Sequence, residues 1–308
     1  MKYTLIYAVI ICGSMLSCKE TPQQKQKVAD TEFVEETNPS SIPISWVNNR
    51  VEKAKKRLDG SEAGKVVWAA MEAMGGLNKW YSNGYLSFRF NYQPLDGSVP
   101  RDTYQTIDTW SNKARHRSVT DSTAIYGWDG KNAWVKAKDS TTFKYNLRFW
   151  ALTPIYLAAQ PLVLDGEGVN FELLPQVDYK DKIQDVVKVT FDSGTGDAPD
   201  DYYILYLDAE THLLSALRYI VSYPGYFPDG GNNPEKFIEL VDRTTVDGIS
   251  FPLKFNTYWS TDDGQPKGEP ITTIELSDIE FLSQVEKNFF DAPEDPRAEA
   301  FVKGDIIY

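Results

Sequence analysis

The sequence predicts a mainly antiparallel β fold with some α-helix, built on one continuous sheet of about twelve strands. Two patterns predict it. From about residue 85 onward, hydrophobic residues recur at every second position, which is the period of a half-buried strand. The segments between strands are short turns, so neighbouring strands are expected to pair antiparallel without crossover helices. One very apolar stretch, residues 142–164, interrupts the alternation with helical spacing.

The first strand shows the alternation clearly, because Leu86, Phe88 and Phe90 are separated by polar residues. Turn signals such as Asp129-Gly130 and Asp247-Gly248 divide the later segments. The predicted strands are 86–92, 102–110, 113–119, 123–128, 132–138, 168–175, 183–192, 201–208, 213–222, 235–246, 249–259 and 270–282.

Helices are predicted before the sheet and within it. Apolar residues over 45–58 recur near i, i+4 and i+7, the spacing of one helical face. Ser61 is suited to cap a second helix, and Gly75-Gly76 to end it in a left-handed conformation. Within residues 142–164, Thr153-Pro154 is expected to end one helix and start another, which gives a short helical pair.

The composition excludes several classes of protein. The chain has 308 residues, 42% of them hydrophobic, enough for one large core or two modest ones. Lys and Arg total 32 against 44 Asp and Glu, a net charge of −12, so no nucleic-acid partner is expected. Two cysteines and two histidines argue against zinc fingers, iron–sulfur clusters and disulfide scaffolds, and no metal or cofactor is expected.

The N-terminus carries a targeting signal. A basic start and an apolar stretch too short to span a bilayer comfortably end at Met15-Leu16-Ser17-Cys18, which resembles the bacterial lipobox. That resemblance implies cleavage before Cys18 and acylation of this cysteine; the alternative is an ordinary secretory signal with an incidental cysteine. We therefore expect a signal peptide at 1–17, a lipidated cysteine and flexible tether at 18–44, and a domain at 45–308.

No catalytic constellation stands out. A G-x-S-x-G elbow is absent, and the lipobox would remove or block both cysteines. His116 and His212 are expected to be structural. Asp278 and Glu280 could serve as an acid–base pair, but a solvated outer face is the favoured interpretation. The acidic loop 192–201 is conceivable as a calcium site and favoured as a plain hairpin loop.

The large rings are the distinctive feature of the chain. A strongly curved sheet has a concave face that must be filled, either by its own side chains or by an apolar ligand. Residues 142–164 would then be a lid over that face. The rings expected to bind a ligand are Phe149, Trp150, Tyr156, Trp110, Trp128 and Trp134.

With these features together, the chain resembles the LolA/LolB-like envelope proteins, and more closely an uncharacterised group of Bacteroidota lipoproteins of that fold. The matching segments are Ala73-Met-Gly-Gly-Leu-x-x-Trp80, Trp128-Asp-Gly-Lys-x-x-Trp134, Val187-Lys-Val-Thr-Phe191 continuing to Gly196-Asp-x-Pro-Asp-Asp-Tyr-Tyr203, and Phe289-Phe-Asp-Ala-Pro293. Met74 departs from the pattern, because related sequences often have His there.

The resemblance implies a single curved, unclosed β-barrel of about 11–12 strands, with helices covering its apolar side and acyl chains as the cargo of characterised members. The expected function is a non-catalytic lipoprotein of the bacterial envelope, at the outer membrane, that binds a lipid or other apolar ligand. Its expected partners are the membrane, through the acyl anchor, and that ligand. The alternative is a structural or protein-binding envelope subunit whose lid fills the cavity; an envelope hydrolase ranks below both.

Overall fold

The structure is a computed structural model that describes residues 37–39, 42–139 and 141–293. The predicted signal peptide, Cys18 and most of the predicted tether at 18–44 lie outside the described residues. Within the tether, Thr37–Pro39 forms a short strand, β1, which pairs antiparallel with β14 (Gln284–Glu286).

All twelve predicted strands are present, and they form one antiparallel sheet that does not close on itself. This confirms the curved, unclosed sheet expected from the sequence. The strands are β2 (Tyr85–Pro94), β3 (Arg101–Asp108), β4 (Ala114–Ser118), β5 (Ile125–Trp128), β6 (Ala133–Lys136), β7 (Val169–Asp178), β8 (Ile183–Phe191), β9 (Tyr203–Asp208), β10 (Leu214–Tyr219), β11 (Lys236–Val246), β12 (Ile249–Ser260) and β13 (Pro266–Leu282).

The order of the strands places the predicted lid between the two edges of the sheet. The order is β6-β5-β4-β3-β2-β13-β12-β11-β10-β9-β8-β7, so the edge strands β6 and β7 are consecutive in the chain. The segment that connects them contains α4 (Leu147–Ala158) and a 3₁₀ turn at Leu162–Leu164. The strand series on either side of this segment meets at the β2–β13 pair, for example at Phe90 and Leu276.

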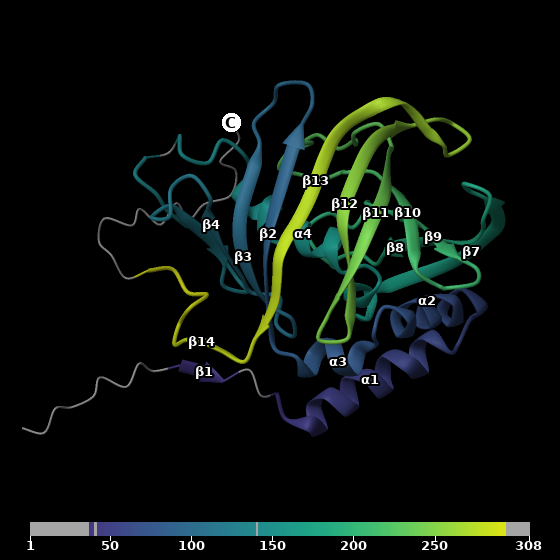
Figure 1. Cartoon of the computed structure of the whole chain (residues 1–308), viewed down its shortest axis with the longest axis horizontal. Helices are drawn as coiled ribbons and strands as arrows, with labels where there is room; N and C mark the ends of the chain where they lie inside the picture. Colours follow the sequence, from purple (N-terminus) through teal and green to yellow (C-terminus); the bar gives the residue numbers. More distant parts are fainter. Residues whose placement is uncertain (1–36, 40–41, 140, 294–308) are drawn as a thin grey trace, which may run out of the picture. The chain divides into compact units, whose positions relative to one another are not determined.

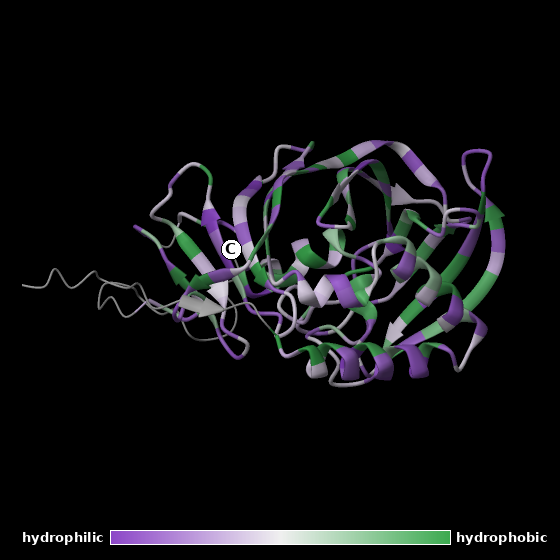
Figure 2. Cartoon of the chain, turned by 60° about the horizontal axis from the view of Figure 1, so that its bottom comes forward, coloured by the Kyte–Doolittle hydropathy of each residue, from purple (hydrophilic) through white to green (hydrophobic). Residues whose placement is uncertain are grey.

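Three helices precede the sheet: α1 (Ile44–Leu58), α2 (Glu62–Ala73) and α3 (Leu77–Ser82). Hydrophilic and hydrophobic residues both occur along α1 (Figure 2), and its buried residues Val47, Ala54 and Leu58 have the spacing of one helical face, as an amphipathic helix requires. The predicted cap of α2 is confirmed, because the Ser61 hydroxyl accepts the Gly64 N–H at 3.0 Å. Gly75 ends the same helix at a φ of 125°, also as predicted. The short helix α3 was not predicted.

The lid differs from its prediction in one respect. Instead of two helices divided at Thr153-Pro154, a single helix α4 runs through Pro154. Its cap is Asn146, whose side chain accepts the Phe149 N–H at 2.9 Å. Pro154 removes the helical N–H donor that would bond to the Trp150 carbonyl. The Thr153 hydroxyl donates to the neighbouring Phe149 carbonyl at 2.7 Å within the same helix. The buried setting of α4 therefore overrides the break that proline favours.

The sheet has two faces with different packing partners. The inner face carries Leu86, Phe88 and Phe90 and belongs to the main core, to which α4 also contributes. The outer face carries two smaller clusters, one around Tyr206 and Phe237 and the other around Tyr85 and Phe290. We use the terms inner face and outer face in this sense. In the described ranges, no helix is long and apolar enough to cross a membrane.

Candidate functional site

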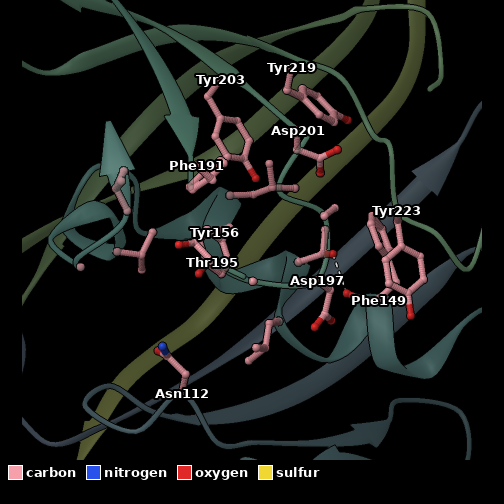
Figure 3. Close-up of a pocket in the computed structure, with 18 of the residues that line it drawn as sticks. Asn112, Phe149, Tyr156, Phe191, Thr195, Asp197, Asp201, Tyr203, Tyr219 and Tyr223 are labelled. Atoms are coloured by element: carbon pink, nitrogen blue, oxygen red, sulfur yellow. Dashed lines mark hydrogen bonds between the residues drawn. The ribbon is translucent and has the colours of Figure 1, made fainter. Parts of the chain in front are cut away.

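A cavity of about 450 Å³ lies at the inner face, bordered by α4, by both series of strands and by the loops after β8 and β10. Figure 3 shows rings from different elements around it, with Tyr203 and Tyr219 on one side and Phe149 and Tyr223 on another. The cavity therefore lies where the lid meets the inner face.

One wall of the cavity is an aromatic contact between the lid and a loop. The ring of Phe149, on α4, lies 5.3 Å from that of Tyr223 and 5.1 Å from that of Tyr226, centroid to centroid. Both tyrosines belong to the Gly/Pro-rich loop after β10. Burial raises the pKa of Tyr226 to about 12, so its hydroxyl stays neutral. This wall is largely aromatic, and its two tyrosines also carry hydroxyl groups.

Trp150 fills part of the inner face beside the cavity. It is only 6% exposed, and its ring packs edge-on against Tyr92 of β2 at 4.9 Å. The guanidinium of Arg101, the first residue of β3, lies 4.6 Å from the centre of the indole. The lid thus supplies both a side chain that fills the groove, Trp150, and side chains that border open volume, such as Phe149.

The opposite wall carries tyrosines and a half-buried carboxylate. Tyr203 and Tyr219 lie on the adjacent strands β9 and β10, with ring centroids 6.4 Å apart (Figure 3). Asp201 lies close by in the chain, and its carboxylate accepts the Ser222 hydroxyl at 2.7 Å. Burial raises the pKa of Asp201 above its ordinary value, against the opposing effect of the Ser222 hydrogen bonds. This side of the cavity can accept hydrogen bonds as well as apolar contacts.

An ion pair with an added hydrogen bond, which we call the Asp165 cluster, lies among the residues that line the cavity. Asp165, just after the 3₁₀ turn of the lid segment, accepts two hydrogen bonds from Arg50 of α1, at 2.6 and 2.9 Å. The hydroxyl of Tyr81 in α3 donates to the same carboxylate at 2.7 Å. The hydrogen bond to Asp165 raises the pKa of Arg50, while burial raises the pKa of Tyr81. These bonds connect the end of the lid segment to two of the N-terminal helices.

A second ion pair lies at the other end of α4. Arg148 pairs with Asp197 of the acidic loop at 2.6 Å, and its guanidinium lies 3.6 Å from the centre of the Trp128 ring. The loop predicted as a plain hairpin therefore borders the cavity. Within the described ranges, no three His, Cys, Asp or Glu side chains are grouped to hold a metal ion.

Four of the six rings predicted to bind a ligand line the cavity: Trp110, Phe149, Trp150 and Tyr156. Trp128 does not, although its strand position is on the inner face, because Arg148 covers its ring. Trp134 is on the outer face. It pairs with Gly127, one position out of phase with Tyr126, and its indole N–H donates to the Phe290 carbonyl at 2.8 Å.

Most of the charged groups of the site were not predicted from the sequence. Arg50, Arg101, Arg148 and Lys236 all line the cavity. Lone basic residues at the first position of a strand, such as Arg101 and Lys236, give no sequence signal, because solvated charges are common there. By contrast, Asp278 and Glu280 are exposed, lie at an irregular step between β13 and β2, and are not among the residues that line this cavity.

Comparison with known proteins gives a likeness of fold. No family model matches the chain, and no curated protein matches it in sequence. The chain is similar to the LolA superfamily protein NE2245 from Nitrosomonas europaea, with 11% identity over 74% of this chain and 96% of that one, and a TM-score of 0.46. A domain from Vibrio parahaemolyticus, described as outer membrane lipoprotein-sorting, shows 10% identity over 75% and 97%, with a TM-score of 0.47.

A third solved structure, a DUF1329 family protein from Desulfovibrio piger, shows 11% identity over 80% of this chain and 97% of that one, with a TM-score of 0.46. The protein from Nitrosomonas europaea is described by the same superfamily name that the sequence motifs indicated. The narrower likeness to a Bacteroidota lipoprotein group stays a prediction. At such low identities no residue role passes from these proteins to this chain, so its function is argued from the cavity itself.

Proposed function

We propose that this protein is an envelope lipoprotein whose cavity binds an apolar ligand, either a lipid or an acyl chain, without catalysing a reaction. The observation that carries the proposal is the cavity of about 450 Å³ between the inner face and α4. Its volume lies in the range of roughly 300–1,000 Å³ that is usual for small-molecule sites. Its walls combine aromatic rings with a few polar groups, the lining that such sites generally have.

The alternative is a structural or protein-binding envelope subunit whose lid fills its own cavity. Trp150 supports this alternative in part, because it occupies the groove beside Tyr92 and is nearly fully buried. However, Phe149, Leu152 and Tyr156 of the same helix border volume that the lid does not occupy. The open volume favours a bound ligand over a fully self-filled cavity.

The proposed location follows from the N-terminal sequence. Cleavage before Cys18 and acylation of this cysteine would anchor the domain to the outer membrane through the tether at 18–44. Acyl chains contribute about 0.8 kcal/mol per buried CH₂, so two signals suffice for stable anchoring without a spanning helix. The membrane is thus the proposed partner of the anchor, and a lipid or apolar small molecule that of the cavity.

A titration with a fluorescent fatty acid tests the binding function. We expect saturable binding by the wild-type domain and at least tenfold weaker binding by Leu152→Trp, whose added ring would occupy the cavity. Leu173→Trp is the matched control, because Leu173 is 46% exposed and is not among the lining residues. Mass spectrometry of organic extracts from the purified protein would then identify co-purified lipid. Absence of saturable binding by the wild-type protein would contradict the proposal.

A further inference from the structure

The cationic side chains that line the cavity fall into two kinds. Arg50 and Arg148 each have a carboxylate partner, Asp165 and Asp197 respectively. Arg101 and Lys236 have no ion-pair partner within the part of the chain that the structure describes. In a protein with a net charge of −12, two cations that stay unpaired at a cavity need an explanation.

Arg101 is surrounded by rings rather than by acceptors. Its guanidinium lies 4.6, 4.9 and 5.5 Å from the ring centres of Trp150, Tyr92 and Tyr145. Rings stabilise the charge but accept its N–H groups poorly, and the Nε of Arg101 is buried without a hydrogen-bond partner. A buried N–H of a charged group without an acceptor costs free energy, which an anionic ligand would recover.

Lys236 lies on the other series of strands and also faces aromatic rings. It begins β11, where Ile238 belongs to the main core, so the two-residue period places Lys236 on the inner face as well. Its ammonium lies 5.6 Å from the Trp259 ring and 6.0 Å from the Tyr219 ring. Burial lowers the pKa of Lys236, and the charge of Arg101 lowers it further, against the attraction of Asp96. Both Arg101 and Lys236 are among the residues that line the cavity, so one bound molecule could contact both side chains.

We propose that Arg101 and Lys236 form a binding site for the negatively charged group of an amphiphile, a carboxylate or phosphate, whose apolar chain occupies the adjoining cavity. The proposal rests on the proposed function and specifies its ligand class. An Arg guanidinium can donate two parallel hydrogen bonds to either group, and the Lys ammonium adds a second, mobile donor. An anion bound at this part of the lining would pair with both positive charges.

Two probes that share a chain and differ in charge test the site. Dodecanoic acid and 1-dodecanol are titrated at pH 8 in competition with a bound fluorescent probe. We expect the wild-type protein to bind the acid about tenfold or more tightly than the alcohol, since a hydrogen bond to a charged group is stronger than one to a neutral hydroxyl. Arg101→Gln and Lys236→Gln should each lose most of this preference while they still bind the alcohol.

Matched variants separate a local effect from a general one. Lys254→Gln removes the same charge from an exposed position on the outer face and should keep the preference. Arg101→Lys keeps the charge and should keep part of the preference, even if Arg101→Gln fails to fold. Equal affinity of the wild-type protein for acid and alcohol would overturn the anion site and leave the binding function intact. If neither compound binds, the proposed function itself is wrong.

A third probe distinguishes an amphiphile from a free anion. Inorganic phosphate should compete only weakly with dodecanoic acid, because it lacks the chain that would occupy the cavity. Phosphate binding that depends on Arg101, combined with equal affinity for acid and alcohol, would overturn the proposal that the ligand is an amphiphile. It would identify a free anion as the ligand instead. A preference for the acid that survives both charge-removing variants would overturn the assignment to Arg101 and Lys236.

Discussion

The Nε2 atom of His116 lies 2.9 Å from the Ala151 carbonyl oxygen, and this hydrogen bond joins the sheet to the lid. His116 is fully buried on β4, and its ring stacks on Tyr126 at 4.3 Å with an interplanar angle of 9°. On the other side of the ring, the Thr103 hydroxyl lies 3.4 Å from Nδ1. A neutral imidazole with its proton on Nε2 satisfies both contacts, since it donates to Ala151 and accepts from Thr103.

This histidine should make the protein sensitive to mild acid. Burial lowers the pKa of His116 from 6.5 to about 4, although the bond to Ala151 acts in the opposite direction. Above pH 6.5 neither state binds the extra proton. Between pH 6.5 and 4 the unfolded state binds it and the folded state does not, so stability falls by up to about 3 kcal/mol as pH drops.

Urea denaturation of the wild-type protein and His116→Gln at several pH values measures this dependence. We expect the variant to be less stable at pH 8 but to lose less stability between pH 6.5 and 4.5. His212→Gln is the control, because it removes the other histidine of the chain, which lies in a turn. Identical pH profiles for the wild-type protein and His116→Gln would show that His116 is not the responsible group.

The Asp165 cluster, in which Asp165 binds Arg50 and Tyr81, should contribute much more to stability than an exposed pair of a basic and an acidic side chain. Asp165→Asn leaves Arg50 and Tyr81 with a weaker acceptor, and we expect a loss of roughly 2–3 kcal/mol, less than for a pair buried on both sides because Arg50 is partly solvated. Asp59→Asn breaks the exposed pair of Asp59 with Lys55 and should cost under about 1 kcal/mol. Chemical denaturation of both variants checks the difference, and equal losses would contradict it.

Phe149 should oppose ligand binding while it stabilises the free protein. Phe149→Ala removes ring contacts with Tyr223 and Tyr226 and should cost about 2 kcal/mol of stability. The same change opens the cavity wall, so affinity for a fluorescent fatty acid should rise. Phe289→Ala, at a half-buried ring packed against the outer face, should leave the affinity unchanged. Lower stability with no binding by either form would indicate a static core helix instead.

The anchor is tested in cells by Cys18→Ala. This change should move the protein from the membrane fraction to the soluble fraction, because the acyl chains would no longer be attached. Ser17→Ala keeps a small residue before the cysteine and should remain in the membrane fraction. A Cys18→Ala protein that still sediments with membranes after a salt wash would contradict the lipobox interpretation.

Most of the fold could be predicted from the sequence because alternation is a local property. Leu86, Phe88 and Phe90 reveal their strand without knowledge of what covers them. Pro154 was misinterpreted for the opposite reason, since its local preference for a helix start is overridden by the burial of α4. The short helix α3 escaped notice because a helix of six residues has too few turns to show a period.

The site could be predicted only in part. Successive residues of a strand point to opposite faces of the sheet, so the pairing register decides which rings lie on the same face. Trp128 and Trp134 look equivalent in sequence, yet the pairing of β5 with β6 puts Trp128 opposite Ala133 and Trp134 opposite Gly127, on different faces. The acidic loop 192–201 was predicted to be a plain hairpin loop from its own residues alone. Its partner Arg148 lies on the lid, and only the three-dimensional structure reveals that Asp197 borders the cavity.

The strand order also has a consequence for how the chain assembles. Every neighbouring pair in the sheet is consecutive in sequence except β2 and β13, so each of the two strand series is a meander of local hairpins. Local hairpins form within microseconds, whereas the β2–β13 seam joins Pro94 to Thr272 and must close a loop of most of the domain. We expect the seam to form last. Closing so long a loop reduces the entropy of the chain before the contacts between β2 and β13 can stabilise it. Until β13 is synthesised, the chain therefore carries its hydrophobic core as two separate half-sheets, each with its apolar face uncovered.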